Sequence, residues 1–404
     1  MATIRKRSWT TAKGESRVAW TVDFFDAQGE RQRRQFAMRK EADAFRVEIE
    51  GQLRTGTFRI DAAKVVVQEV ADRFLEHCER RLKRGERMTQ KNYNTYAGHV
   101  RNYICPDSER QKKGKRFNKR MRPFRDGIAK TKIGQLTPRA VSDLCDRLRD
   151  AGVSVQTTRK ILGTVKVMLE YAVLRDFVAV NVARSVEVIG RRDEGAKKII
   201  PPEKDVIRRI IDVAQEDFRV QIIVASATGL RAGEHHALRW HHVDLERGEI
   251  KVETRVDAYG NEDVTKTAAG MRTIPIAAPV VTALKAWKLR TKRKKSGDLV
   301  FPGVGGGYAN HDSMVRWKFD PCFDRLERLH TADPARHPPP PARCNWHALR
   351  HFAISCWIEA GLSPKTVQTF AGHSSLQMTM DRYGHLFKSD DHKRAMDAIA
   401  KELY

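Results

Sequence analysis

Apolar residues recur with a period of two near the start of the chain and with a helical period soon after. Every second residue in the range 18–24 is apolar, which predicts a half-buried β-strand. Turn-forming residues at 26–29 and the polar stretch 30–38 predict a returning strand. Helical spacing then extends over 42–53. Residues 1–60 are therefore expected to form a three-stranded sheet packed on one helix.

Residues 64–185 carry apolar stripes at the spacing of α-helices, which predicts an all-helical domain. One helix should begin at Thr137-Pro138, because threonine caps a helix and proline fits its first turn. The stripes comprise Val66, Val70, Phe74 and Leu75; Tyr93, Tyr96, Val100 and Ile104; Val141, Leu144 and Leu148; and Ile161, Val165, Met168, Leu169 and Ala172. The polar residues 186–200, which include two glycines, are expected to be an interdomain linker.

Residues 201–404 are expected to form a mostly helical third domain with one β-hairpin. The hairpin is predicted from strands at 250–256 and 264–267, followed by a further strand at 273–276. Four consecutive prolines at 338–341 predict an extended surface loop. The fold class is therefore mainly α, with small β elements, in three domains.

The net charge of the chain indicates which class of partner it binds. The chain has 404 residues, with 76 Lys and Arg against 50 Asp and Glu, a formal charge of +26. A protein this basic is attracted to a polyanion, which is usually nucleic acid. We expect no membrane partner, because no apolar run is long enough to span a bilayer and no basic amphipathic helix is evident. A basic insertion at 106–132 is predicted to protrude as a loop or hairpin, either as a solvated surface or as a phosphate contact.

The six cysteines lack C-x-x-C spacing, and no Cys/His cluster has zinc-ligand spacing. We expect reduced thiols, no metal and a cytoplasmic location, because structural disulfides form mainly in oxidising compartments. The N-terminus has positive charge but no apolar segment behind it, so no secretory signal is expected.

Four segments of the third domain carry polar residues that packing alone does not explain. Arg231 follows Gly229 where a helix could begin, with Glu234 three residues further on. Lys266 lies beside the turn of the predicted hairpin. Each of these, taken alone, is more often a solvated surface residue, and Lys251 and Arg272 compete with Lys266 as the functional cation of the hairpin.

The other two segments hold the aromatic and imidazole candidates. His347 and Arg350 are three residues apart and share a helix face. His351 falls on a neighbouring face and could equally be a packing residue. His373 precedes a predicted helix cap at Ser374-Ser375, and Tyr383 follows ten residues later.

Together these residues suit one reaction. A phosphodiester under attack gains negative charge, which preorganised cations stabilise. Tyrosine is a weak nucleophile at its ordinary pKa of about 10 and needs a base and a positive field to act. Two arginines, two histidines, a lysine and a late tyrosine supply those elements.

The sequence also resembles a known family in these segments. TGLRAGEHHALRW, HALRH, AGHSS and MTMDRYGHL are similar, in order and spacing, to the signature motifs of tyrosine recombinases, closely those of phage integrases of the lambda type. The likeness is strongest over residues 199–388. It implies an arm-type DNA-binding domain at 1–60, a core-binding domain at 64–185 and a catalytic domain at 201–404. Ala348 departs from the family, which often has an acidic residue at that position.

The resemblance assigns a role to each matching position. Tyr383 would attack the scissile phosphate, giving a 3′-phosphotyrosyl link and a free 5′-hydroxyl. Arg231 and Arg350 would clamp the non-bridging oxygens, and Lys266 would protonate the departing 5′ oxygen. His347 would be the acid–base partner of the tyrosine. His373 would hydrogen-bond the phosphate, and Glu234 would support the site.

The family needs neither metal nor ATP, and it acts as a homotetramer on double-stranded DNA attachment sites. The resemblance also implies a directionality factor and a host DNA-bending protein as helpers. In the family the C-terminal tail can pack on a neighbouring subunit. The matching tail of this chain is a predicted helix at 392–404, which could pack in that way or on its own domain. The leading hypothesis is an integrase of a phage or other mobile element, in the cytoplasm of a bacterial host. Alternatives are a chromosome or plasmid dimer resolvase, a type IB topoisomerase and a catalytically silent DNA-binding regulator.

Overall fold

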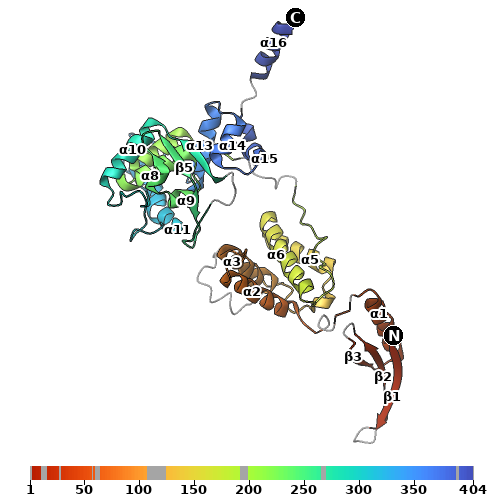
Figure 1. The fold of residues 1–404 in the computed structure, drawn as a ribbon. Coiled ribbons are helices and arrows are strands. Elements are labelled where there is room, and N and C mark those ends of the chain that lie inside the picture. The colour runs from red at the N-terminus through yellow and green to blue at the C-terminus, as the bar shows by residue number, and fades with distance from the viewer. Residues whose placement is uncertain are drawn as a thin grey trace. The chain divides into compact units, whose positions relative to one another are not determined.

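The computed structural model divides the chain into two compact units, residues 1–195 and 196–404, which we treat separately (Figure 1). The boundary falls inside the segment predicted as a linker. The described residues are 2–10, 16–26, 29–56, 58–59, 64–106, 124–191, 199–264, 270–387 and 391–403, the last range without the side chains of its first five residues.

The first unit begins with the predicted sheet and helix. Strands β1 (Thr3–Thr10), β2 (Ser16–Phe25) and β3 (Arg31–Phe36) are antiparallel in that order, and α1 (Arg39–Arg54) packs on them. The apolar positions of β2 meet one stripe of α1, and with Ala2 they form a small core that includes Val22, Phe24, Ala42 and Ile49. The helical spacing is confirmed, and the alternation of β2 is confirmed except at its first position, residue 18, which is exposed.

The rest of the first unit is helical, as predicted. Its elements are α2 (Val67–Lys83), α3 (Gln90–His99), the π-helical turn η2 (Val100–Ile104), the short turn η3 (Ile133–Gln135), α5 (Pro138–Asp150) and α6 (Val155–Leu174). The Thr137 hydroxyl accepts a hydrogen bond from the Ala140 amide at 3.2 Å, which confirms the predicted cap. All four predicted stripes contribute to one core.

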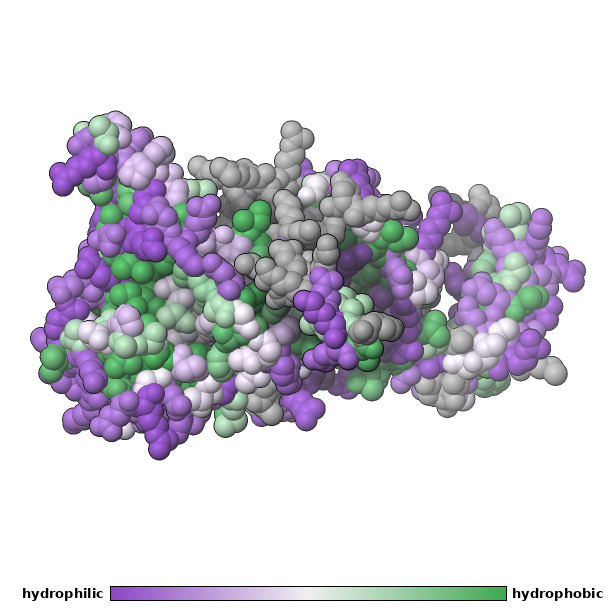
Figure 2. Space-filling view, turned by 90° about the horizontal axis from the view of Figure 1, so that it is seen from above, coloured by the Kyte–Doolittle hydropathy of each residue, from purple (hydrophilic) through white to green (hydrophobic). Residues whose placement is uncertain are grey.

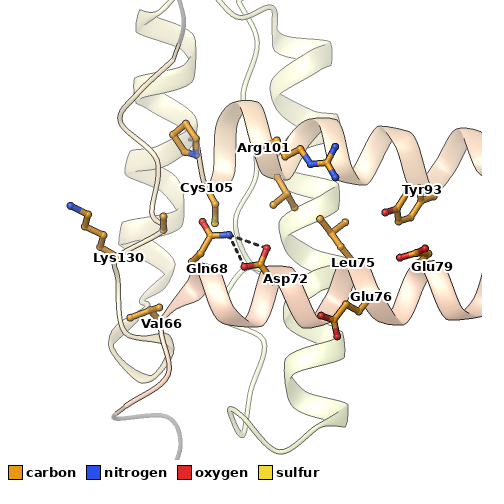
Figure 3. A pocket seen from close by; sticks show the side chains of 13 residues that line it. Val66, Gln68, Asp72, Leu75, Glu76, Glu79, Tyr93, Arg101, Cys105 and Lys130 are labelled. Carbon is orange, nitrogen blue, oxygen red and sulfur yellow. Dashed lines mark hydrogen bonds between the residues drawn. The ribbon is translucent and has the colours of Figure 1, made fainter. Parts of the chain in front are cut away.

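An open groove of about 850 Å³ runs along α2 in this helical part (Figure 3). Acidic side chains of α2, namely Asp72, Glu76 and Glu79, line one wall, and Tyr93 and Arg101 line the other. Most of the basic insertion, residues 107–123, lies outside the described residues, so its predicted protrusion is not assessed. Where the chain is described again, Phe124 and Ile128 are buried in the helical core.

The second unit is mostly helical. It contains α7 (Lys204–Val213), α8 (Glu216–Thr228), α9 (Ala232–Ala237), the turn η5 (Trp240–His242), α10 (Ala278–Arg290), α11 (His311–Met314), the π-helical turn η7 (Val315–Phe319), α12 (Asp320–Ala332), α13 (His347–Glu359), α14 (Pro364–Ala371), α15 (Leu376–Tyr383), the turn η8 (Gly384–Leu386) and α16 (Asp391–Leu403). Helix α8 packs against α7, α10 and α13, so it lies at the centre of the unit.

The predicted hairpin of this unit is confirmed in part, because two antiparallel strands meet around the expected turn near Gly260-Asn261. The expected single strand at 250–256 is wrong, because it is two strands that join different sheets. Strand β5 (Glu249–Val252) pairs with β4 (Val243–Asp244) and β8 (Arg272–Pro275), whereas β6 (Thr254–Val256) pairs with β7 (Glu262–Val264). The chain divides because Ile250 and Val252 enter the core, while β6 passes over α9. The expected strand end at 265–267 lies outside the described residues.

The surface features are simple. Hydrophilic residues cover much of the face seen in Figure 2. The four prolines form an extended surface segment, as predicted, and Arg209 donates to the carbonyls of Pro338 and Pro339 at 2.9 Å. Within the described ranges, every helix is too short or too polar to cross a membrane.

His235 on α9 is a buried polar residue whose ring lies against the aromatic side chains of Phe301 and Trp346. Its ring is fully buried and stacks on Phe301 at 4.7 Å, and neither ring nitrogen has a hydrogen-bond partner. Burial holds its pKa well below the usual range, and the main chain of Gln221 offsets part of that shift. An unsatisfied buried polar group costs about 1–3 kcal/mol.

We expect His235→Leu to raise the free energy of unfolding by about 1–3 kcal/mol at neutral pH, because the unsatisfied nitrogens are removed. The gain should grow as the pH falls below about 6.5, because the histidine takes up a proton only when the chain unfolds. Denaturant unfolding at several pH values measures this. The exposed His241→Leu is the control, with little expected change, and a destabilised His235→Leu variant would contradict the prediction.

Candidate active site

Arg231 stands at the junction of two helices. Gly229 ends α8 in the left-handed conformation, with φ of 58°, and Arg231 is the residue that precedes α9. The Arg231 guanidinium donates to Glu234 at 2.8 Å and to the Gly372 carbonyl at 2.7 Å. Its side chain keeps 41% of its surface exposed, so part of the fork remains accessible to a ligand.

Arg350 on α13 lies deeper. It is 3% exposed, and its two terminal nitrogens donate to the carbonyls of Gly229 at 2.6 Å and Ala371 at 2.5 Å. Burial and the charge of Arg231 lower the pKa of Arg350 to about 9. These carbonyls belong to the ends of α8 and α14, so the fork is held by main chain at both of its terminal nitrogens.

A buried ion pair between Arg272 and Glu234 supports Arg231. Arg272 on β8 donates to the two carboxylate oxygens of Glu234, at 2.8 and 3.2 Å, and to the Phe370 carbonyl at 2.7 Å. Burial alone would raise the pKa of Glu234, but the hydrogen bonds from Arg272 and the charges of Arg272 and Arg231 bring it to about 2. Glu234 therefore stays ionised and orients two guanidinium groups.

Gly372 is required where α14 ends. Its φ is 64°, and a β-carbon there would lie 2.8 Å from the Arg272 guanidinium. Only glycine lets the main chain approach so closely while its carbonyl accepts from Arg231.

The cluster carries an excess of positive charge. Three guanidinium groups, from Arg231, Arg272 and Arg350, surround one carboxylate, that of Glu234. Uncompensated cations in a partly buried site favour an anionic ligand, and the arginine fork matches two phosphate oxygens.

Tyr383 lies at the end of α15 beside this cluster. It is 1% exposed, and burial raises the pKa of its hydroxyl although Arg350, Arg382 and Arg231 act in the opposite direction. Its hydroxyl oxygen lies 2.6 Å from Nδ1 of His351 on α13. The structure therefore brings His351, and not His347, within hydrogen-bond distance of Tyr383.

His347 lies one helical turn before His351, with the two ring centroids 4.7 Å apart. It is the more exposed of the two side chains. Partial burial, His351 and the neighbouring arginines lower the pKa of His347 to about 4, and burial, Arg350 and Arg382 lower that of His351 to about 4. Both rings are neutral near pH 7.

His373 also lies beside Tyr383. Its ring stacks on the tyrosine with 6.1 Å between centroids, and its Nδ1 lies 2.9 Å from the Thr379 hydroxyl. This contact leaves Nε2 as the nitrogen that could meet a substrate. Ser375 caps α15 through the Met378 amide at 3.2 Å, as the sequence predicted.

Comparison with known proteins agrees with this geometry. Residues 203–390 match the profile of the phage integrase family. The chain is a tyrosine recombinase of this family. The matched segment contains every site residue described above.

Two curated relatives cover much of the recombinase. It is 24% identical over 366 residues to a tyrosine recombinase XerC-like protein of Caldanaerobacter subterraneus subsp. tengcongensis, with 86% of each chain covered. It is also 24% identical to the ICEBs1 integrase of Bacillus subtilis, over 67% of this chain and 72% of that protein. Its relatives therefore include proteins named as a tyrosine recombinase and as an integrase.

Two solved structures share its fold. One is the integrase of transposon Tn1549 in complex with transposon right end DNA, with a TM-score of 0.59 and 18% identity over 83% of this chain and all of that chain. The other is a lambda integrase dimer bound to a core site, with a TM-score of 0.50 and 14% identity over 95% of each chain. At these identities the likeness establishes the fold.

Two site features of the recombinase escaped the sequence pattern. The sequence offers Arg272 only as a rival to Lys266, whereas its guanidinium is bonded to Glu234 and Phe370. The sequence is compatible with either a packing or a functional role for His351, and its contact with Tyr383 depends on the placement of α15. Lys266 lies outside the described residues. Within the described part, no group of three or more His, Cys, Asp or Glu could hold a metal ion.

Proposed function

We propose that the protein is a site-specific integrase that cleaves and rejoins DNA through a 3′-phosphotyrosine at Tyr383. The observation that carries this proposal is the arginine cluster placed beside a buried tyrosine whose hydroxyl contacts an imidazole nitrogen. Such a site can bind a phosphate and supply a nucleophile to it.

Each matching residue has a place in the reaction. Arg231 and Arg350 bind the non-bridging oxygens and stabilise the charge of the pentacoordinate phosphorus. Lys266 protonates the departing 5′ oxygen, and His373 donates through Nε2 to the phosphate. His347, exposed beside the arginines, is the acid–base residue that faces the phosphate. Glu234 holds Arg231 and Arg272 in position.

The partner is double-stranded DNA carrying attachment sites. A formal charge of +26 supplies the attraction to phosphate. The related integrases of Tn1549 and lambda are described in complex with DNA, the lambda enzyme also as a tetramer on a Holliday junction. The named integrases among the relatives favour insertion of a mobile element over dimer resolution. A directionality factor and a host DNA-bending protein fit the same proposal.

A homotetramer has structural support in the second unit. Helix α16 exposes an apolar stripe of Met396, Ile399 and Leu403. An open apolar groove of about 370 Å³ lies between α7, α8 and α13, lined by residues that include Ile207, Ile223 and Trp357. The stripe of one copy is suited to cover such a surface on the next copy.

The domain at 1–60 is proposed to bind arm-type DNA, and the helical domain at 64–185 to bind the core site. In the first of these, the outer residues of the sheet are basic, with Arg5, Lys6 and Arg7 exposed on β1. On β3, Arg31 and Arg33 pair with Asp23 at 3.3 and 2.9 Å, which holds their side chains along the strand surface.

The test is to trap the covalent intermediate. We expect a DNA fragment that spans the junction between the element and its host chromosome to become linked to the protein in EDTA. After denaturation and protease digestion, the attached peptide should contain Tyr383 and block the 3′ end of the cleaved strand, leaving a 5′-hydroxyl on the other end. A peptide on the 5′ end, or on another residue, would refute the proposal.

A further inference from the structure

The hydroxyl of Tyr383 needs an acceptor for its hydrogen. The side chain is 1% exposed, so bulk water does not supply one, and buried hydroxyl groups are almost always hydrogen-bonded. Among the described residues, the contact found for this oxygen is Nδ1 of His351 at 2.6 Å. The hydroxyl therefore donates to Nδ1, and the ring carries its own hydrogen on Nε2.

The geometry points to His351 as the catalytic base that takes the proton of Tyr383 during attack on DNA, an inference that rests on the proposed function. As the bond from the tyrosine oxygen to phosphorus forms, the O–H proton moves to Nδ1 and the bond from phosphorus to the 5′ oxygen breaks. The departing 5′ oxygen receives its proton from the general acid, Lys266 in the proposed function. In rejoining, the imidazolium returns its proton to the tyrosine oxygen as that oxygen leaves phosphorus.

The two histidines of α13 thereby have separate tasks. They lie one helical turn apart on one side of the helix, and of the two it is His351 that lies within hydrogen-bond distance of the nucleophile. His347 is the more exposed side chain and lies within the influence of Arg231 and Arg350, where the phosphate would bind. It is placed to act on the phosphate, while His351 acts on the tyrosine.

The charges around His351 make its pKa depend on whether the substrate phosphate is bound. Among the described residues, the charged and titratable groups near its ring are His347 and Arg350 on α13 and Arg382 and Tyr383 on α15. The two arginines add to burial in lowering the pKa of His351 to about 4 in the DNA-free protein. A bound phosphate would offset their charge and raise this pKa, so the base strengthens when a scissile phosphate arrives.

The test compares His351→Asn with His347→Asn on two substrates. An asparagine oxygen can still accept a hydrogen bond from Tyr383 but cannot take its proton. The first substrate is the junction DNA, cleaved by Tyr383. The second is a strand that ends in a 3′-nitrophenyl phosphate, joined to a 5′-hydroxyl by enzyme that also carries Tyr383→Phe. This second reaction uses no tyrosine proton.

We expect His351→Asn to slow cleavage by roughly 10²–10⁴-fold, the usual contribution of a general base, and to remove the fall in rate at low pH. Joining of the nitrophenyl strand should stay within about twofold. His347→Asn should slow both reactions, because it acts on the phosphate in both. Normal cleavage by His351→Asn, or equal slowing of both reactions, would overturn the assignment and leave a purely structural contact.

A measurement without DNA complements this comparison. Nitrogen NMR of the free protein should show His351 with its hydrogen on Nε2 and a hydrogen-bonded Nδ1 whose signal moves in Tyr383→Phe. A hydrogen on Nδ1 would contradict the assignment. If wild-type protein forms no covalent adduct on junction DNA, the proposed function fails and this inference with it. If it forms one while His351→Asn cleaves normally, only the inference fails.

Discussion

Replacing Tyr383 by phenylalanine should abolish covalent attachment to DNA, with a loss of roughly 10⁶-fold in cleavage, as when a covalent nucleophile is removed from other enzymes. DNA affinity should change little, because the arginine cluster that meets the phosphate is intact. The free energy of unfolding should fall by about 1–3 kcal/mol, since Nδ1 of His351 loses its buried partner. Gel shift, adduct trapping and denaturant unfolding measure the three quantities.

The matched control for this variant is Tyr96→Phe. Tyr96 lies in the first unit, where its ring packs on Phe74 with 5.6 Å between centroids. Removing its hydroxyl should leave adduct formation unchanged. An adduct formed by Tyr383→Phe at a rate near that of wild type would show that another residue attacks the phosphate.

Glu234→Gln should be the most destabilising change in the site. The carboxylate is 4% exposed and bonded to both Arg231 and Arg272. Glutamine removes the negative charge and leaves Arg272 buried without its counterion, which costs about 3–5 kcal/mol of unfolding free energy. Cleavage should fall as well, because Arg231 loses the group that orients it. Denaturant unfolding at pH 7, with cleavage assays on the folded fraction, measures both effects.

The pH dependence of this effect has a definite sign. The pKa of Glu234 is about 2 in the folded protein and ordinary in the unfolded chain, so its ionised form stabilises the fold at neutral pH. That contribution is complete above the unfolded pKa of about 4.3 and disappears as the pH falls through 2. The stability difference between wild type and Glu234→Gln should therefore shrink by about 3 kcal/mol over this interval.

Asp324→Asn is the control for Glu234→Gln. Asp324 pairs with Arg343, and both side chains are about half exposed. Such an ion pair contributes at most about 1 kcal/mol, because solvent screens it. A loss no larger for Glu234→Gln than for Asp324→Asn would contradict the structural role assigned to the buried carboxylate.

The helices and strands of the first unit could be predicted from the sequence because they depend on local periodicity. The alternation in β2 and the stripes of α2, α5 and α6 each encode one apolar face, and a buried face needs only the spacing of its own residues. The caps at Thr137 and Ser375 are equally local, since each side chain bonds an amide three residues away.

The order of Arg231, His347, Arg350, His373 and Tyr383 in the sequence predicts a phosphoryl-transfer site, because these residue types suit a single reaction, and this chemistry stays a prediction. Their contacts depend on segments far apart in the chain. Arg231 meets Gly372 across 141 residues, and Arg350 meets Gly229 across 121. Such pairings follow from the packing of α8, α13 and α14, which no local pattern specifies.

The other differences between the predicted and the observed structure also arise from long-range packing. Strand β5 pairs with β8, whereas β6 pairs with β7. The two strands are separate because burial of Ile250 and Val252 competes with continuation of one straight strand. Arg272 became a buried partner of Glu234, and His351 the contact of Tyr383, through long-range packing alone. The sequence by itself determined the elements and the residue types of the site. Only the tertiary structure decided which histidine touches the nucleophile, because that depends on how two helices separated by the α14 segment pack together.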